Sequence, residues 1–134
     1  MEKQIEVEAV SFILISDSSI LVEQRSLSKA TDPGIISIPG GHVEPNESLE
    51  EACKREMFEE LDLKGYQYTE IDIVEHVTPK EIQTIHYFKC NDWSGEIVVN
   101  EADIVFWLPF SKIDDIHYDF ERKILQDIID SEKV

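Results

Sequence analysis

The chain has 134 residues, and 29 acidic residues against 12 lysines and arginines give it a formal net charge of −17. A chain of this length fits one domain with a single hydrophobic core, so the predicted domain covers residues 1–134. The charge repels phosphate groups at long range and therefore argues against binding to a nucleic-acid polymer or a membrane. For the same reason, a polyphosphate ligand would require divalent cations to screen it.

Cys53 and Cys90 are the only cysteines in the sequence. Two cysteines cannot make a disulfide framework or a four-cysteine zinc site. The N-terminal segment Met1–Glu6 lacks the apolar stretch of a secretory signal, and no apolar run reaches the length of a membrane span. We therefore expect a soluble, cytoplasmic protein.

The first forty residues are predicted to form strands. Val7–Ile15 and Ile20–Glu23 are strand candidates, joined by a hairpin turn at Asp17-Ser18-Ser19. A polar loop follows, and then a short apolar run at Ile35–Ile38 is broken by Pro39-Gly40-Gly41. This part of the chain is therefore expected to contribute a hairpin and a tight, glycine-rich loop.

Leu49–Leu61 is predicted to be an amphipathic helix. Ser48 and Glu51 have the Ser-x-x-Glu spacing of a capping box, which marks a helix start. Apolar residues at helical spacing form one stripe: Leu49, Cys53, Met57 and Leu61. We expect this stripe, including the first cysteine, to face the core.

The second half of the chain is again predicted to be mainly strand. Tyr66–Val77 and Ile82–Cys90 read as a strand pair turned at Thr78-Pro79-Lys80, and Ile97–Val99 and Ile104–Leu108 as two shorter strands.

The tail, from about Tyr118 to Ile129, is predicted to be an amphipathic C-terminal helix. Its apolar residues at helical spacing are Phe120, Ile124, Leu125, Ile128 and Ile129. Strands thus dominate, with one central and one terminal helix. This order predicts an α/β sandwich in which helices cover a mostly mixed sheet.

The predicted central helix carries three closely spaced carboxylates, Glu56, Glu59 and Glu60. Residues three and four positions apart are neighbours on a helix, so these like charges repel and destabilise it modestly. Mg²⁺ reverses the effect, because it prefers carboxylate oxygens and keeps positions open for water and phosphate. The spacing therefore indicates a metal site, with a solvated acidic surface as the alternative.

The wider pattern makes a family resemblance definite. The segment Gly41–Leu63 resembles the Nudix box, G-x5-E-x7-R-E-U-x-E-E-x-G-U, in which U is aliphatic. The fixed positions that match are Gly41, Glu47, Arg55, Glu56, Glu59 and Glu60. The box glycine after the last glutamate pair is here Asp62. That position favours a left-handed backbone, which Asp adopts at a cost of roughly 1 kcal/mol.

The resemblance implies a Nudix fold, an α/β/α sandwich with a central mixed sheet and a loop–helix–loop catalytic motif. It also implies Mg²⁺ or Mn²⁺ as cofactor. Carried onto this chain, Glu56 and Glu60 are the implied direct ligands, and Glu59 binds directly or through water. The carbonyl of Gly40 completes such a site, and Gly40 and Gly41 allow the diphosphate to approach the backbone closely.

The resemblance further assigns supporting and catalytic roles. Arg55 and Glu47 match box residues that hold one another and orient the metal-binding carboxylates. The implied reaction is attack of a metal-activated water on phosphorus, with a carboxylate accepting the proton. For this base we consider Glu101, six residues before Trp107, and then Glu96. A solvated loop acid is the alternative for both.

Other residues are assigned more simply. Arg25 ends the second predicted strand, where similar enzymes carry a basic residue that reaches the substrate, and Lys29 is a weaker candidate. His42 has no second histidine placed to form a zinc pair. Three aromatic residues are expected in the core rather than as platforms for a base: Tyr87, Phe88 and Trp107.

Two other functions compete with hydrolysis. The stretch from Gln24 to Gly34 also resembles isopentenyl-diphosphate isomerase, a relative on the same fold. That enzyme has a cysteine before the Gly-His of its loop, where this chain has Gly40 before Gly41-His42, and it lacks a complete hydrolase box. A non-catalytic Nudix module that binds a nucleotide is the third reading, although such modules usually lose box glutamates.

The implied substrate is a small molecule, either a nucleoside triphosphate or a nucleoside diphosphate derivative. Pro79 lies sixteen residues past the box, a position associated in some relatives with ADP-ribose hydrolysis. A turn proline explains it equally well. The sequence leaves the exact nucleotide open, as it does the choice between monomer and homodimer.

Overall fold

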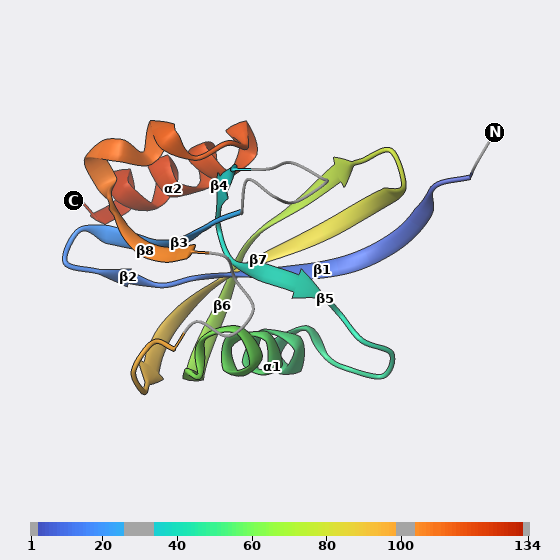
Figure 1. Cartoon of the computed structure of the whole chain (residues 1–134), viewed down its shortest axis with the longest axis horizontal. Helices are drawn as coiled ribbons and strands as arrows, with labels where there is room; N and C mark the ends of the chain where they lie inside the picture. Colours follow the sequence, from blue (N-terminus) through green and yellow to red (C-terminus); the bar gives the residue numbers. More distant parts are fainter. Residues whose placement is uncertain (1–2, 26–33, 99–103, 133–134) are drawn as a thin grey trace.

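The computed structural model describes residues 3–25, 34–98 and 104–132. Its strands form two sheets, and its two α-helices lie on opposite sides of them (Figure 1). Within the described residues, no helix is both long enough and apolar enough to cross a bilayer. The predicted α/β class with a mixed sheet is confirmed.

The larger sheet has the strand order β5-β1-β7-β6. β1 (Ile5–Ile13) runs parallel to β7 (Glu81–Ser94) and antiparallel to β5 (Gly40–His42), while β6 (Lys64–Val77) pairs antiparallel with β7. The β6–β7 turn lies at the predicted position, where the Thr78 amide donates to the Glu81 carbonyl at 2.8 Å. This mixed sheet carries the segment that was expected to be only a break, Gly40-Gly41, as part of an edge strand.

The smaller sheet is antiparallel and centres on β3 (Ser19–Gln24). β2 (Ile15–Ser16) and β4 (Ile36–Ser37) pair with its two ends, and β8 (Ile104–Pro109) pairs with its whole length. The sequence pattern had merged β1 and β2 into one strand, because the apolar run continues through Leu14. The Leu14 carbonyl instead accepts the Leu21 amide at 3.0 Å, where the chain passes from one sheet to the other.

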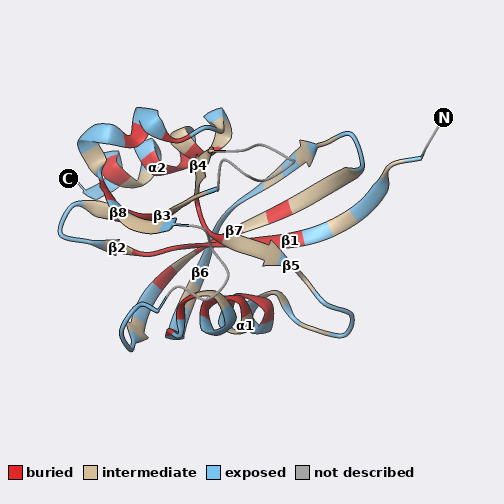
Figure 2. Cartoon of the chain, in the orientation of Figure 1, coloured by how far each residue is buried: buried red, intermediate tan, exposed pale blue. Residues whose placement is uncertain are grey.

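Each helix covers its own apolar layer. α1 (Leu49–Leu61) packs through Cys53 and Met57 against one face of the larger sheet. α2 (Asp119–Glu132), which follows the 3-10 helix η1 (Phe110–Asp115), packs through Ile124 and Leu125 on the other side. Figure 2 shows the buried residues concentrated where the strands pass between the two helices. Burial of Cys53, as expected, raises the pKa of its thiol to about 12.

Three local predictions are corrected by the structure. Ile97 and Val98 lie outside any strand, and Val99 falls outside the described residues. Only Ile36–Ser37 of the predicted run Ile35–Ile38 is a strand. Trp107, expected in the core, is 37% exposed, although its register partner Leu21 is buried.

Candidate active site

Helix α1 begins and ends as local chemistry dictates. The Ser48 hydroxyl accepts a hydrogen bond from the Glu51 amide, and the Glu51 carboxylate accepts one from the Ser48 amide, both at 3.1 Å. At the other end Asp62 adopts the left-handed conformation, with φ 59° and ψ 25°, and its amide donates to the last turn. The helix is therefore fixed over Leu49–Leu61, the range that the sequence predicts.

The two glycines of β5 lie at points of close packing. A Cβ built on Gly41 would overlap the carboxylate of Glu56, coming within 2.6 Å of its Oε2 atom. A Cβ on Gly40 would collide with the backbone of β1, including the Ser11 Cα at 2.8 Å. The glycines thus allow the box strand to lie directly against both β1 and the Glu56 side chain.

Arg55 is the hydrogen-bonding centre of the site. Its Nε and Nη2 atoms donate to the two oxygens of Glu47 at 2.7 and 3.0 Å, a bidentate pair. Its Nη1 donates to Glu56 at 2.9 Å and to Glu59 at 3.1 Å, and Nη2 also donates to the His42 carbonyl at 2.9 Å. One guanidinium therefore connects the loop before α1, strand β5 and the helix carboxylates.

These contacts favour the charged forms of both Arg55 and Glu47. The hydrogen bonds from Arg55, followed by one from the Glu44 amide, lower the pKa of Glu47. The bond to Glu47 raises the pKa of Arg55 further, although partial burial opposes the rise. The pair is therefore ionised at neutral pH, and the positive charge offsets the repulsion among the helix carboxylates.

The helix carboxylates differ in exposure and do not converge. Glu56 is buried, Glu60 is half-buried, and the Glu59 side chain is 45% exposed. In the ranges that the structure describes, no group of three or more Asp, Glu, His or Cys residues is arranged to hold a metal ion. The Arg55 guanidinium pairs with one oxygen of Glu56 and one of Glu59.

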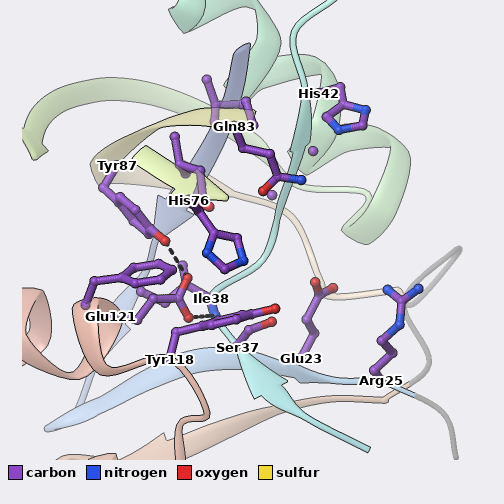
Figure 3. A pocket seen from close by; sticks show the side chains of 17 residues that line it. Glu23, Arg25, Ser37, Ile38, His42, His76, Gln83, Tyr87, Tyr118 and Glu121 are labelled. Atoms are coloured by element: carbon purple, nitrogen blue, oxygen red, sulfur yellow. Dashed lines mark hydrogen bonds between the residues drawn. The ribbon is translucent and has the colours of Figure 1, made fainter. Parts of the chain in front are cut away.

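A pocket of about 290 Å³ opens beside the box strand (Figure 3). Gly40 and Gly41 form one edge, and Arg25 and Glu23 approach from the end of β3. Aromatic side chains from two other elements add a wall, with the rings of His76 and Tyr118 5.1 Å apart. The floor is Glu121, which accepts a hydrogen bond from the hydroxyl of Tyr87. The pocket thus combines flat aromatic surfaces with several polar and charged side chains, which together can hold a small polar molecule.

A comparison with protein-family models decides the relationship. The model described as the NUDIX domain matches residues 6–128. This chain belongs to the Nudix family.

Known Nudix proteins resemble the chain over most of its length. It is 33% identical over 89 residues to an 8-oxo-dGTP diphosphatase of Proteus vulgaris, covering 66% of this chain and 79% of that one. A CTP pyrophosphohydrolase of Escherichia coli is 28% identical over 101 residues, covering 75% and 74%. The MutT Nudix hydrolase structure from Burkholderia pseudomallei superimposes with a TM-score of 0.77 at 25% identity, covering 90% and 96%. The predicted class, a MutT-like Nudix pyrophosphohydrolase, is confirmed.

The structure places the remaining candidate site residues of the sequence analysis as follows. Arg25 lines the pocket. Glu101 and Lys29 fall outside the described residues, and Glu96 is exposed. His42 forms a pair with Glu81, with 3.3 Å between Nε2 and Oε1. The contact expected between Arg55 and Glu47 is present.

The sequence analysis missed the far side of the pocket. Tyr118, His76 and Glu121 were not considered as site residues, although all three line the pocket and Glu121 is only 3% exposed. The sequence did contain a sign that Glu121 is buried. It stands three and four positions before Ile124 and Leu125, on the apolar stripe of α2. No comparable signal marked the two aromatic side chains.

Proposed function

We propose that this Nudix hydrolase cleaves a diphosphate linkage in a nucleoside triphosphate or a nucleoside diphosphate derivative, with Mg²⁺ or Mn²⁺ as cofactor. One observation carries the proposal. The Gly40-Gly41 strand separates the Arg55-organised carboxylates from a pocket of about 290 Å³. A nucleoside held in the pocket would bring its phosphates across the glycines to the carboxylates.

The donor set suits a hard divalent cation. Glu56, Glu60 and the carbonyl of Gly40 would hold it, and Glu59 would join directly or through a water. One oxygen of Glu60, Oε2, is already buried. Glu59 is exposed enough to exchange its contact with Arg55 for the cation. When bound, the cation neutralises the diphosphate and lowers the pKa of an attacking water.

The remaining roles belong to residues of the chain itself. Arg55 and Glu47 hold Glu56 in place, because the bidentate pair ties α1 to the loop that precedes it. Arg25 is placed to contact the base or the phosphates from the end of β3. Glu101, with Glu96 as the second choice, is the proposed acceptor of the water proton. Tyr118 and His76 provide flat surfaces for a base.

The relatives narrow the substrates to test first. Their names specify 8-oxo-dGTP and CTP, so we propose nucleoside triphosphates, including oxidised ones, ahead of ADP-ribose and similar diphosphates. We also propose a cytoplasmic location, no binding to nucleic-acid polymers, and function as a monomer or homodimer.

A substrate panel tests the proposal. Nucleoside triphosphates, their oxidised forms, ADP-ribose and isopentenyl diphosphate are incubated with the enzyme and Mg²⁺ or Mn²⁺, and products are identified by mass. In ¹⁸O-labelled water, hydrolysis should place the label on one phosphate product. Double-bond migration in isopentenyl diphosphate, without phosphate cleavage in any nucleotide, would instead favour the isomerase.

Matched variants separate a catalyst from a binding module. Glu60→Gln removes one proposed ligand and should lower turnover by roughly 100-fold or more without unfolding the protein. Asp127→Asn changes an exposed carboxylate on α2 and should leave turnover unchanged. A Glu60→Gln enzyme with wild-type turnover would contradict the proposed metal site, and a wild-type protein that only binds nucleotides would contradict hydrolysis.

A further inference from the structure

Glu121 is a carboxylate that neither the Nudix box nor the proposed chemistry uses. It lies in the first turn of α2, is 3% exposed and forms the floor of the nucleoside pocket. Its Oε1 accepts a hydrogen bond from the Ile38 amide at 3.0 Å, and its Oε2 accepts one from the Tyr87 hydroxyl at 2.7 Å. Figure 3 shows both bonds meeting at the one carboxylate.

The two donors come from different elements. Tyr87 is fully buried on β7, in register with Ser11 of β1, so it belongs to the rigid centre of the larger sheet. Ile38 lies in the short connection between β4 and β5, two residues before Gly40. The carboxylate therefore ties the C-terminal helix and the sheet to the segment that leads into the box glycines.

A second contact reinforces this connection. The His117 amide, just before α2, donates to the Ile36 carbonyl of β4 at 2.9 Å. On the other side, the Phe12 amide donates to the Pro39 carbonyl at 3.0 Å. Residues 36–39 are thus held by backbone bonds at their ends, while the Glu121 side chain holds the centre from the pocket floor.

We propose that Glu121 is a positioning residue, whose carboxylate fixes Ile38 and thereby sets where Gly40 and Gly41 lie between the nucleoside pocket and the carboxylates of α1. This inference rests on the proposed function. A Cβ at Gly41 would overlap the Glu56 carboxylate, so the strand lies directly against this side chain. A shift of the strand by a fraction of an ångström would therefore displace a proposed metal ligand.

The charge of Glu121 is part of this role. Burial raises the pKa of its carboxyl to about 7, while the bonds from Tyr87 and Ile38 oppose the rise and the nearby Glu23 adds to it. A charge-assisted hydrogen bond is stronger than a neutral one, so protonation weakens the hold on Ile38. Titratable and charged groups that share the pocket with it are Glu23, Arg25, His42, His76, Tyr87 and Tyr118.

Three variants test the role. Glu121→Gln keeps the shape, since its amide oxygen can still accept from Ile38 and its NH₂ can donate to the Tyr87 oxygen, but it removes the charge. Glu121→Ala removes both bonds and should lower kcat/KM by roughly 10- to 100-fold. Asp127→Asn, on the exposed side of the same helix, is the matched control and should behave as wild type.

The pH profile separates positioning from simple stabilisation. For the wild type, kcat/KM should fall below a pH of about 7, with the change mainly in KM because the pocket and strand loosen together. In Glu121→Gln this transition should disappear while the enzyme stays active. A Glu121→Ala enzyme that is folded and keeps the wild-type kcat/KM would overturn the proposal, as would an unchanged pH transition in Glu121→Gln.

Amide NMR gives a readout that does not require turnover. The ¹⁵N–¹H resonance of Ile38 should titrate with pH in the wild type and not in Glu121→Gln, and the resonances of Gly40 and Gly41 should shift in Glu121→Ala. Absence of these changes would overturn the positioning role even in an active enzyme. A wild-type protein with no activity on any nucleotide would contradict the proposed function. In that case, the expected NMR changes at Ile38, Gly40 and Gly41 would still support the connection from α2 to the box strand.

Discussion

At the scale of single residues, the site is organised by the guanidinium of Arg55 and by the absence of a Cβ at Gly41. Arg55 distributes five donor contacts over the loop, strand β5 and helix α1. Gly41 leaves room for the Glu56 carboxylate, which a Cβ at this position would force to move. The Nudix pattern of a glycine, an arginine and spaced glutamates thus has a direct steric and electrostatic cause in this chain.

The substitution Gly41→Ala tests the steric part. The added methyl group would displace the Glu56 carboxylate from its place. We therefore expect turnover to fall by roughly 100-fold and to recover in part only at high Mg²⁺ concentration. Steady-state kinetics at several Mg²⁺ concentrations measure the effect. In a double-mutant cycle with Glu56→Asp, whose shorter side chain relieves the overlap, the two losses should be less than additive. Strict additivity would show that the two residues act independently.

The substitution Arg55→Lys tests the electrostatic part. A lysine keeps the charge but cannot make the bidentate pair with Glu47 while also contacting Glu56 and Glu59. We expect Arg55→Lys to lower kcat roughly 10- to 100-fold, because mutations of residues that hold metal ligands in place have effects of this size. The neighbouring exposed Lys54→Arg is the control and should retain the wild-type rate. Equal rates for Arg55→Lys and wild type would mean that charge alone suffices.

At the scale of elements, the end of α1 departs from the Nudix pattern. Asp62 stands where the box has a glycine and adopts a positive φ of 59°. A non-glycine residue there is strained, and its negative charge lies at the unfavourable end of the helix dipole. The backbone nevertheless caps the helix, because the Asp62 amide donates to the Phe58 carbonyl at 3.0 Å.

Asp62→Gly should therefore stabilise the protein by about 1 kcal/mol. Urea denaturation followed by circular dichroism measures the change in the free energy of unfolding. Asp62→Asn removes the charge and retains most of the backbone strain, so it should give a smaller gain. If Asp62→Gly were destabilising, the aspartate side chain would have to contribute more than its strain costs.

At the scale of the whole molecule, Glu121 links stability to pH. Its pKa is raised from 4.5 to about 7 in the folded protein. The folded state then binds a proton more tightly than the unfolded state, so this contribution is complete below pH 4.5 and is lost as the pH rises through about 7. We expect the wild type to lose about 3 kcal/mol relative to Glu121→Gln across this window.

Chemical denaturation of both proteins at intervals between pH 5 and pH 8 measures this difference, using pH values on either side of the shifted pKa. Comparing the two proteins removes the contributions of the other carboxylates, such as Glu47, whose lowered pKa affects stability at more acidic pH. A difference that does not vary with pH would show that Glu121 titrates near its ordinary value.

Much of the fold and part of the site could be predicted because their causes are local. The bounds of α1 follow from its capping box and apolar stripe, and the contact between Arg55 and Glu47 joins residues only 8 positions apart. The predictions failed where local pattern and tertiary environment disagree. Gly40-Gly41 looks like a break but forms a strand, since β1 offers it hydrogen-bonding partners. Trp107 was expected in the core but is 37% exposed.

The sequence by itself determined the family, the central helix and the carboxylates that the helix presents, because turns of one helix place such residues together whatever surrounds them. Only the tertiary structure decided the pocket and its floor. The bond from Ile38 to Glu121 joins residues 83 positions apart, and it exists because α2 packs against the sheet that β1 and β7 form by parallel pairing. Burial at that junction, which no local pattern specifies, turns an ordinary surface-type acid into a buried one with a shifted pKa.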